Sequence, residues 1–173
     1  VVDGKSIVGK SILDISQYIL GPYGYIFEIV NLLHVALNEP ASYLENGQQP
    51  FSRPEMISGG SREVLIVKMN NSGKGAGGLV SFRIGTTDLR LVVAFQIFNN
   101  GNKFGAAFVP SNFPADANLM VYLTSDDQWS TSPDRKFGMA KDGPLVIQTR
   151  NIRAKVSMTE GLKVALNIVV KTC

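Results

Sequence analysis

The sequence of 173 residues has very few of the side chains that most often carry chemistry. It contains one cysteine, one histidine and one tryptophan. Because the only cysteine is Cys173, the last residue, the sequence predicts neither an internal disulfide nor a thiolate cluster that holds a metal. His34 lies in an apolar run, where a structural role is favoured over catalysis. We therefore expect no metal and no cofactor.

The sequence also has no long apolar run and no block of charge. No stretch approaches the roughly 18 consecutive apolar residues of a membrane-spanning helix, so an integral membrane protein of the helical type is not expected. The formal charge of +3 and pI near 9.0 fit a weak preference for anionic surfaces. Lysine and arginine are scattered along the chain, however, and this pattern argues against nucleic acid as a partner. With 45% hydrophobic residues, the chain is predicted to form a single domain, 1–173, with a substantial core.

Two segments that superficially suggest an enzyme lack the required pattern. The glycine-rich segment 72–78, SGKGAGG, lacks the order of a phosphate-binding loop and leads into a predicted strand, so a flexible hairpin loop is expected there. Asp126 and Asp127 are adjacent in the sequence, which gives them no geometry that indicates acid–base catalysis. We therefore predict that the protein is not an enzyme.

Residues 1–20 have the period of an α-helix with two opposed faces. The apolar face contains Val1, Val8, Ile12, Ile15 and Ile19, and the polar face contains Asp3, Ser6, Lys10, Asp14 and Gln17. The segment fits either a helix at a membrane interface or a surface helix packed on a globular core. A turn follows at residues 21–24 and contains Gly21, Pro22 and Gly24. It is predicted to end the helix and to act as a hinge.

Beyond this turn the hydrophobic period changes from 3.6 to about 2, which is typical of strands. The alternating segments are 62–69, 78–84, 89–98 and 162–170, separated by clusters of Asn, Gly, Asp and Ser. This spacing predicts an all-β sandwich or barrel over residues 25–173. Residues 25–37 fit either a strand or a helix, and a second helix is expected near 117–127. The predicted fold class is therefore mainly β, a β-sandwich flanked by two helices of which the N-terminal one is amphipathic.

The order of several short segments resembles a known family. Tyr43–Gly47 is similar to an aromatic-containing YFRSG segment, and Pro54 is followed by REVLIVKM, GAGGLVSF at 75–82 and DLRLVVAFQIF at 88–98. Near the end, Thr149–Asn151 precedes SMTEGLKVALNIVV. In this collinear order the chain resembles the actinoporins, the pore-forming cytolysins of sea anemones and their relatives.

The resemblance implies a mechanism. A secreted, soluble monomer binds the target membrane through loops of the sandwich, oligomerises, and releases the N-terminal helix about the hinge into the bilayer. A 20-residue helix is about 30 Å long, which is enough to cross the hydrocarbon core. The apolar face would then contact lipid, and the polar face would line a pore shared by several copies. The first residue is Val and not Met, which is consistent with removal of a leader, a propeptide or a tag.

The chain departs from the family where actinoporins hold a phosphocholine headgroup among Tyr and Trp side chains. The corresponding segment keeps only phenylalanines, Tyr122 is out of register, and the pocket's serine and valine positions become Gln96 and Gly77. A sphingomyelin pocket of the usual kind is therefore not expected. Another lipid headgroup or a glycan is expected to contact a different set: Asn99, Asn100, Asn102, Lys103, Phe104, Tyr122 and Trp129.

Two alternatives stay open at this point. Trp129 lies in a polar segment that suits an interfacial anchor, but a half-buried tryptophan covering the core fits equally well. The protein as a whole fits either a pore-forming cytolysin or a non-lytic, lectin-like module that binds lipid or glycan on the same kind of sandwich.

Overall fold

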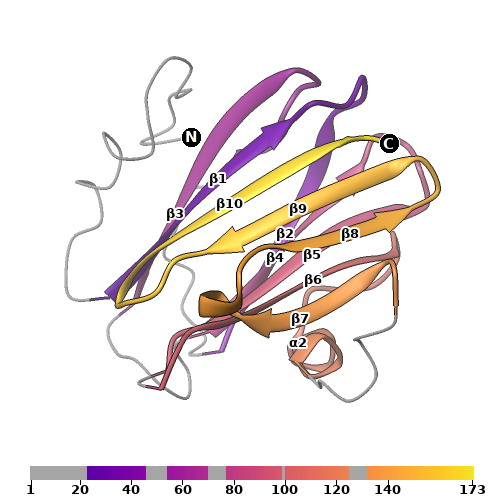
Figure 1. Ribbon diagram of the computed structural model, residues 1–173. Coiled ribbons are helices and arrows are strands. Elements are labelled where there is room, and N and C mark those ends of the chain that lie inside the picture. The colour runs from indigo at the N-terminus through magenta and orange to yellow at the C-terminus, as the bar shows by residue number, and fades with distance from the viewer. Residues whose placement is uncertain (1–22, 46–53, 70–76, 99, 125–131) are drawn as a thin grey trace.

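The computed structural model describes residues 23–45, 54–69, 77–98, 100–124 and 132–173, and within them ten strands form two five-stranded sheets (Figure 1). Sheet I has the order β3 (Ser61–Met69), β1 (Tyr23–Asn31), β10 (Lys163–Thr172), β9 (Ile152–Met158) and β8 (Leu145–Thr149). Sheet II has the order β2 (Leu37–Leu44), β4 (Gly77–Ile84), β5 (Leu89–Gln96), β6 (Lys103–Pro110) and β7 (Arg135–Met139). In the described residues the helical elements are α2 (Ala117–Thr124) and the short 3₁₀ helix η2 (Ala140–Asp142).

The strand pairing is antiparallel except at the centre of sheet I. There β1 and β10 run parallel, with Gly24 opposite Lys163 and Asn31 opposite Val170. The first and last described strands are therefore neighbours in the middle of one sheet.

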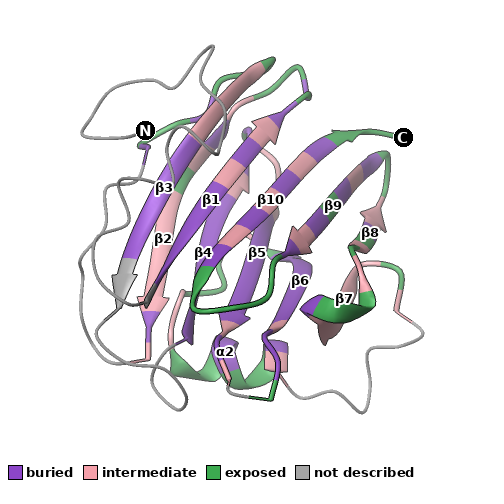
Figure 2. Ribbon diagram, turned by 60° about the vertical axis from the view of Figure 1, so that its left-hand side comes forward, coloured by how far each residue is buried: buried purple, intermediate pink, exposed green. Residues whose placement is uncertain are grey.

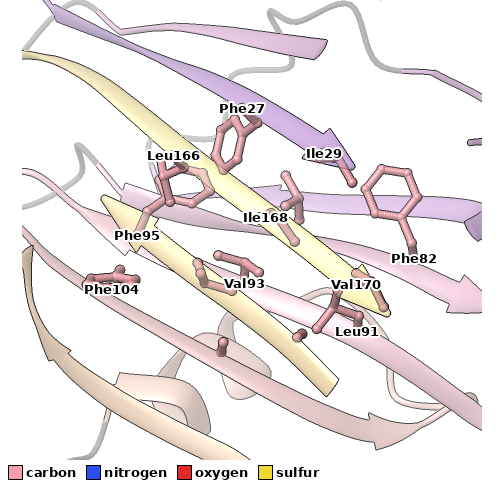
Figure 3. Packing of buried hydrophobic residues seen from close by; sticks show 14 of the residues in the cluster. Phe27, Ile29, Phe82, Leu91, Val93, Phe95, Phe104, Leu166, Ile168 and Val170 are labelled. Atoms are coloured by element: carbon pink, nitrogen blue, oxygen red, sulfur yellow. The ribbon is translucent and has the colours of Figure 1, made fainter. Parts of the chain in front are cut away.

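The main core lies between the two sheets. Buried and partly exposed residues alternate along β9 and β10, so that one face of each strand points inward (Figure 2). The rings of Tyr25 and Phe27 from sheet I pack against Phe95 from sheet II, at centroid distances of 4.4 and 4.9 Å. Phe104 lies in the same cluster, together with Leu166 and Val93 (Figure 3). Burial of these large apolar side chains between the layers is the main source of stability.

A second apolar cluster covers the outer face of sheet II. Leu119, Met120 and Leu123 are the buried residues of α2. They pack on outward-facing residues of β4, β5 and β6, namely Leu79, Val92, Ala94, Ala107 and Val109. A Cβ on Gly105 would lie only 3.0 Å from the Leu123 carbonyl oxygen, so glycine allows β6 and the C-terminal end of α2 to approach closely.

The four alternating segments are all strands, and the mainly β, two-layer architecture is confirmed. The helix expected near 117–127 is α2, and residues 25–37 resolve into β1 followed by a loop in which His34 is exposed. The N-terminal helix expected over residues 1–20 lies outside the described residues.

Two sequence expectations are wrong. The glycine-rich segment 72–78 is not the loop of a hairpin, because β3 belongs to sheet I and β4, which begins at Gly77, belongs to sheet II. Gly24 is not part of a hinge. It is the second residue of β1, pairs with both neighbouring strands, and donates its N–H to the Leu162 carbonyl oxygen at 3.0 Å. Gly21 and Pro22 lie outside the described residues.

Within the described part of the chain, no helix has the length and apolar character needed to cross a bilayer. The same residues contain no group of three or more His, Cys, Asp or Glu side chains placed to hold a metal ion.

Candidate functional site

Two of the expected headgroup contacts are structural residues instead. Phe104 is fully buried and points into the core between the sheets (Figure 3). Asn102 is 1% exposed, and its side-chain amide donates to the carbonyl oxygens of Thr159 and Gly161 at 3.1 and 2.9 Å. The backbone N–H of Asn102 also donates to Glu160 Oε1 at 3.1 Å. Because their groups are already buried or hydrogen-bonded within the protein, these two predictions are wrong.

The start of β6 leaves two of the expected residues accessible. Asn100 is exposed, and Lys103 is partly exposed with its Nζ 5.5 Å from the centre of the Phe98 ring. This is a cation–π contact within the chain. Asn99 and Trp129 lie outside the described residues.

Gln96 and Gly77, the positions at which the sequence departs from the pocket expected by resemblance, lie beside Glu45. Gln96 Nε2 donates to Glu45 Oε1 at 3.0 Å. A Cβ on Gly77 would collide with Glu45 Oε1 and would lie 2.7 Å from Gln96 Cγ. Burial, together with the charge of Glu45, raises the pKa of the nearby Tyr25 hydroxyl, which therefore stays neutral. Gln96 and Glu45, hydrogen-bonded to each other, thus occupy the space next to Gly77.

Tyr122 lies in a different environment, a groove beside α2. Its side chain is 42% exposed and meets the 38% exposed ring of Phe113 edge-on, with a centroid distance of 6.4 Å and an interplanar angle of 72°. The guanidinium carbon of Arg135 lies 4.7 Å from the centre of the Tyr122 ring. The groove has a volume of about 290 Å³ and is lined by Phe113, Pro114, Asp116, Asn118, Leu119 and Tyr122.

Local sequence explains why this groove forms. Asp116 is the N-cap of α2, since its Oδ1 accepts a hydrogen bond from the Leu119 N–H at 2.9 Å. The helix then buries Leu119, Met120 and Leu123 on sheet II, which turns Tyr122 and Val121 outward. Phe113 lies three residues before the cap. Its N–H donates to the carbonyl oxygen of Pro110, the last residue of β6, at 3.0 Å.

The groove combines the aromatic surface of Phe113 and Tyr122 with the carboxylate residue Asp116, and the Arg135 guanidinium lies over the Tyr122 ring. Aromatic rings that expose one edge to water suit an interface between water and an apolar phase. The sequence pattern had pointed to Tyr122, but Phe113 and Arg135 were missed. A lone aromatic residue just before a capping Asp, in the segment SNFPAD, was the available signal for Phe113. Arg135 had none, because β7 brings it to the ring from 13 residues away.

The residues assigned to membrane insertion and to the pore lining all lie outside the described residues. They are Val1, Val8, Ile12, Ile15 and Ile19 for insertion, and Asp3, Ser6, Lys10, Asp14 and Gln17 for the lining. Their roles stay predictions.

The described part of the chain is thus a two-layer β-sandwich protein with an exposed aromatic groove beside a helix on one outer face. Among solved structures, it is similar to the crystal structure of the lipid-binding protein Nakanori, with a TM-score of 0.66 and 12% sequence identity. The match covers 92% of this chain and 76% of that chain, and at this identity it establishes a common fold. The chain matches no protein-family model and no curated protein sequence.

Proposed function

We propose that this protein binds lipid membranes through the groove beside α2. The observation that carries the proposal is the exposed pair of Phe113 and Tyr122, with the Arg135 guanidinium over the Tyr122 ring. Insertion of the two rings at the level of the lipid headgroups would remove apolar surface from water, while the guanidinium would face lipid phosphates. The sandwich fold shared with a protein described as lipid-binding supports the same function.

We further propose that binding leads to pore formation, in line with the resemblance of the sequence to actinoporins. The protein would be secreted as a soluble monomer, oligomerise on the membrane, and insert residues 1–20 as an amphipathic helix. The support for this step is the separation of apolar and polar residues in that segment. Nothing in the proposal requires an enzymatic activity or a cofactor.

Binding is tested by co-sedimentation with phosphatidylcholine vesicles, with and without sphingomyelin or anionic lipid. We expect Phe113→Ala and Tyr122→Ala each to weaken binding by about tenfold, which corresponds to about 1.4 kcal/mol. Met56→Ala removes a more exposed apolar side chain away from the groove and should bind as the unmodified chain does. Equal binding by all three variants would rule out the groove as the membrane contact.

Pore formation is tested by dye leakage from the same vesicles, with the full chain and a chain lacking residues 1–20. If the segment inserts, the shortened chain still binds but releases no dye. If both chains bind and neither releases dye from any composition, the protein is a non-lytic lipid-binding or glycan-binding module.

A further inference from the structure

A group of cationic side chains lies on the outer face of sheet I, whereas α2 lies on the outer face of sheet II. Odd-numbered residues of β9 and β10 are partly or fully exposed there, while the even-numbered ones as far as Val170 are buried (Figure 2). The outward residues Arg153, Lys155 and Lys171 surround a hollow of about 350 Å³, together with Val146 and Val169. The hollow is therefore lined by three cationic and two apolar side chains.

Strand register forces these cations together. Lys171 is directly opposite Arg153 across β9 and β10, and Lys155 is opposite Val169 in the next row. Like charges directly opposite one another on a sheet face destabilise it. The arrangement is therefore unfavourable unless an anion, or a counter-ion from solution, reduces the repulsion.

The protein supplies no carboxylate to this group within the described residues. Arg153 donates one hydrogen bond, from a terminal nitrogen to the neutral Gln148 Oε1 at 3.2 Å, and its Nε is buried with no hydrogen-bond partner. Glu28, on the same face of β1, is already bonded to Arg62 Nη2 at 2.6 Å and to Asn167 Nδ2 at 2.7 Å.

Other arginines of the described chain contrast with Arg153. Each of four, Arg62, Arg83, Arg90 and Arg150, has a carboxylate within ion-pair distance. Arg153 thus keeps a guanidinium in a concave site with unused hydrogen-bonding capacity and two lysines beside it. A guanidinium and ammonium groups are the side chains best suited to bind phosphate oxygens.

We propose that this hollow is a binding site for a phosphate monoester, with Arg153, Lys155 and Lys171 contacting the phosphate oxygens. The apolar part of the ligand next to the ester bond would rest on Val146 and Val169. The site is independent of the proposed membrane contact, because α2 and its groove lie on the outer face of the other sheet. A phosphate monoester occurs both in soluble metabolites and in the headgroup of an anionic lipid such as phosphatidic acid.

The first test measures thermal unfolding of the full chain in sodium phosphate and in sodium chloride at equal ionic strength. Specific binding raises the melting temperature in phosphate above that in chloride, and the gain in stability grows with the logarithm of the phosphate concentration above the dissociation constant. We expect Lys155→Gln combined with Lys171→Gln to lower the phosphate affinity by at least about tenfold. Replacing the same two lysines by arginine keeps the charge and should retain binding.

A matched control removes two lysines elsewhere, Lys141→Gln with Lys163→Gln, which are both exposed and outside the hollow. This variant has the same net charge as the test variant, so a general charge effect would lower both affinities equally. Equal loss in the two variants, or no difference between phosphate and chloride, would overturn the proposal.

The source of the phosphate is distinguished with two further probes, glycerol 3-phosphate in solution and vesicles that contain phosphatidic acid. A melting shift with glycerol 3-phosphate that Lys155→Gln with Lys171→Gln abolishes supports a soluble ligand. Loss of vesicle binding in that variant, against a background of Phe113→Ala, supports a lipid phosphate. The melting shift does not depend on the α2 groove, so the phosphate site and the membrane contact at the groove are tested separately, and failure of one proposal does not contradict the other.

Discussion

At the scale of single residues, Arg90 is the most constrained charged group of the described chain. It is 6% exposed, and its Nε donates to Ser81 Oγ at 2.6 Å. Its Nη2 donates to the Glu39 carbonyl oxygen, and its Nη1 lies 3.8 Å from Glu39 Oε2. Glu39 has a φ of 47° where the pairing of β2 with β4 shifts register. Burial lowers the pKa of Arg90 and the charge of Glu39 opposes that effect, so the guanidinium holds the bulge as a cation.

We expect Arg90→Met to lower the free energy of unfolding by about 2–4 kcal/mol, because it leaves the buried Ser81 hydroxyl and the Glu39 carbonyl group without their donor. Urea denaturation followed by circular dichroism measures this loss. Arg83→Met is the control, since Arg83 bonds the same exposed carboxylate from a more exposed position, and it should cost less than about 1 kcal/mol. Similar losses in both variants would contradict the role given to Arg90.

Asn102, like Phe104, has a role that differs from its sequence interpretation. Asn102→Ala removes two hydrogen bonds that tie the start of β6 to the turn between β9 and β10. We expect a loss of about 2–3 kcal/mol in the free energy of unfolding, with unchanged vesicle binding per folded molecule. Asn100→Ala, at an exposed position two residues earlier, should be nearly neutral in the same denaturation experiment. A reduced affinity for vesicles in a fully folded Asn102→Ala protein would restore its assignment as a headgroup contact.

At the scale of elements, the sequence predicts β3, β4, β5 and β10 from their hydrophobic segments and does not predict β6 or β9. β10 alternates between buried and partly exposed residues, and its pattern was recognised. β5 and β6 are both covered by the core on one face and by α2 on the other. β5 was recognised because LRLVVAFQ is rich in large and β-branched residues, whereas Gly105, Ala106 and Ala107 interrupt the apolar run of β6, so it was not recognised as a strand. The assignment of Phe104 to a surface site failed because nothing local distinguishes an aromatic residue at a strand's inner face from one in a loop.

The groove depends on the short helix α2, so its capping residue is expected to affect binding. Asp116→Ala removes the side-chain cap of an eight-residue helix and should cost about 1 kcal/mol in stability. Fraying of the first turn also disturbs the Phe113 and Tyr122 pair, so vesicle affinity should fall as well. Asp116→Asn retains a capping oxygen and serves as the control in denaturation and co-sedimentation. Equal behaviour of the two variants would show that the cap does not support the groove.

At the scale of the whole molecule, the two sheets are joined by an ion pair as well as by the core. Asp88 precedes β5 of sheet II, and Arg150 lies between β8 and β9 of sheet I. Arg150 Nη1 and Nη2 donate to the Asp88 carboxylate oxygens at 2.7 and 3.1 Å. The side-chain hydrogen bonds from Arg150 are the largest cause that lowers the pKa of Asp88 below its ordinary value of 3.8. Both groups are exposed, so the contribution is small and sensitive to salt.

The sign of the pH effect follows from that shift. A carboxyl group whose pKa is lower in the folded state stabilises the fold at a pH above its pKa in the unfolded state. This stabilisation is lost as the pH falls through its pKa in the folded state. The part of the acid destabilisation that depends on Asp88 should therefore appear below pH 3.8 and disappear in Asp88→Asn. Melting temperatures between pH 2 and 6 measure it, with Asp142→Asn as an exposed control. An unchanged pH profile in Asp88→Asn would contradict the assignment.

The parallel pairing of β1 with β10 has a consequence for how the protein is made. The central pair of sheet I joins strands from opposite ends of the described chain, as does the hydrogen bond between Glu28 and Asn167, 139 residues apart. On the ribosome, β1 emerges long before its partner is translated, and until then one of its edges has no strand to pair with. Sheet I is completed only after β10 has left the exit tunnel, and pairing over such a distance in sequence is slow, so the unpaired edge of β1 makes the nascent chain prone to aggregation until then.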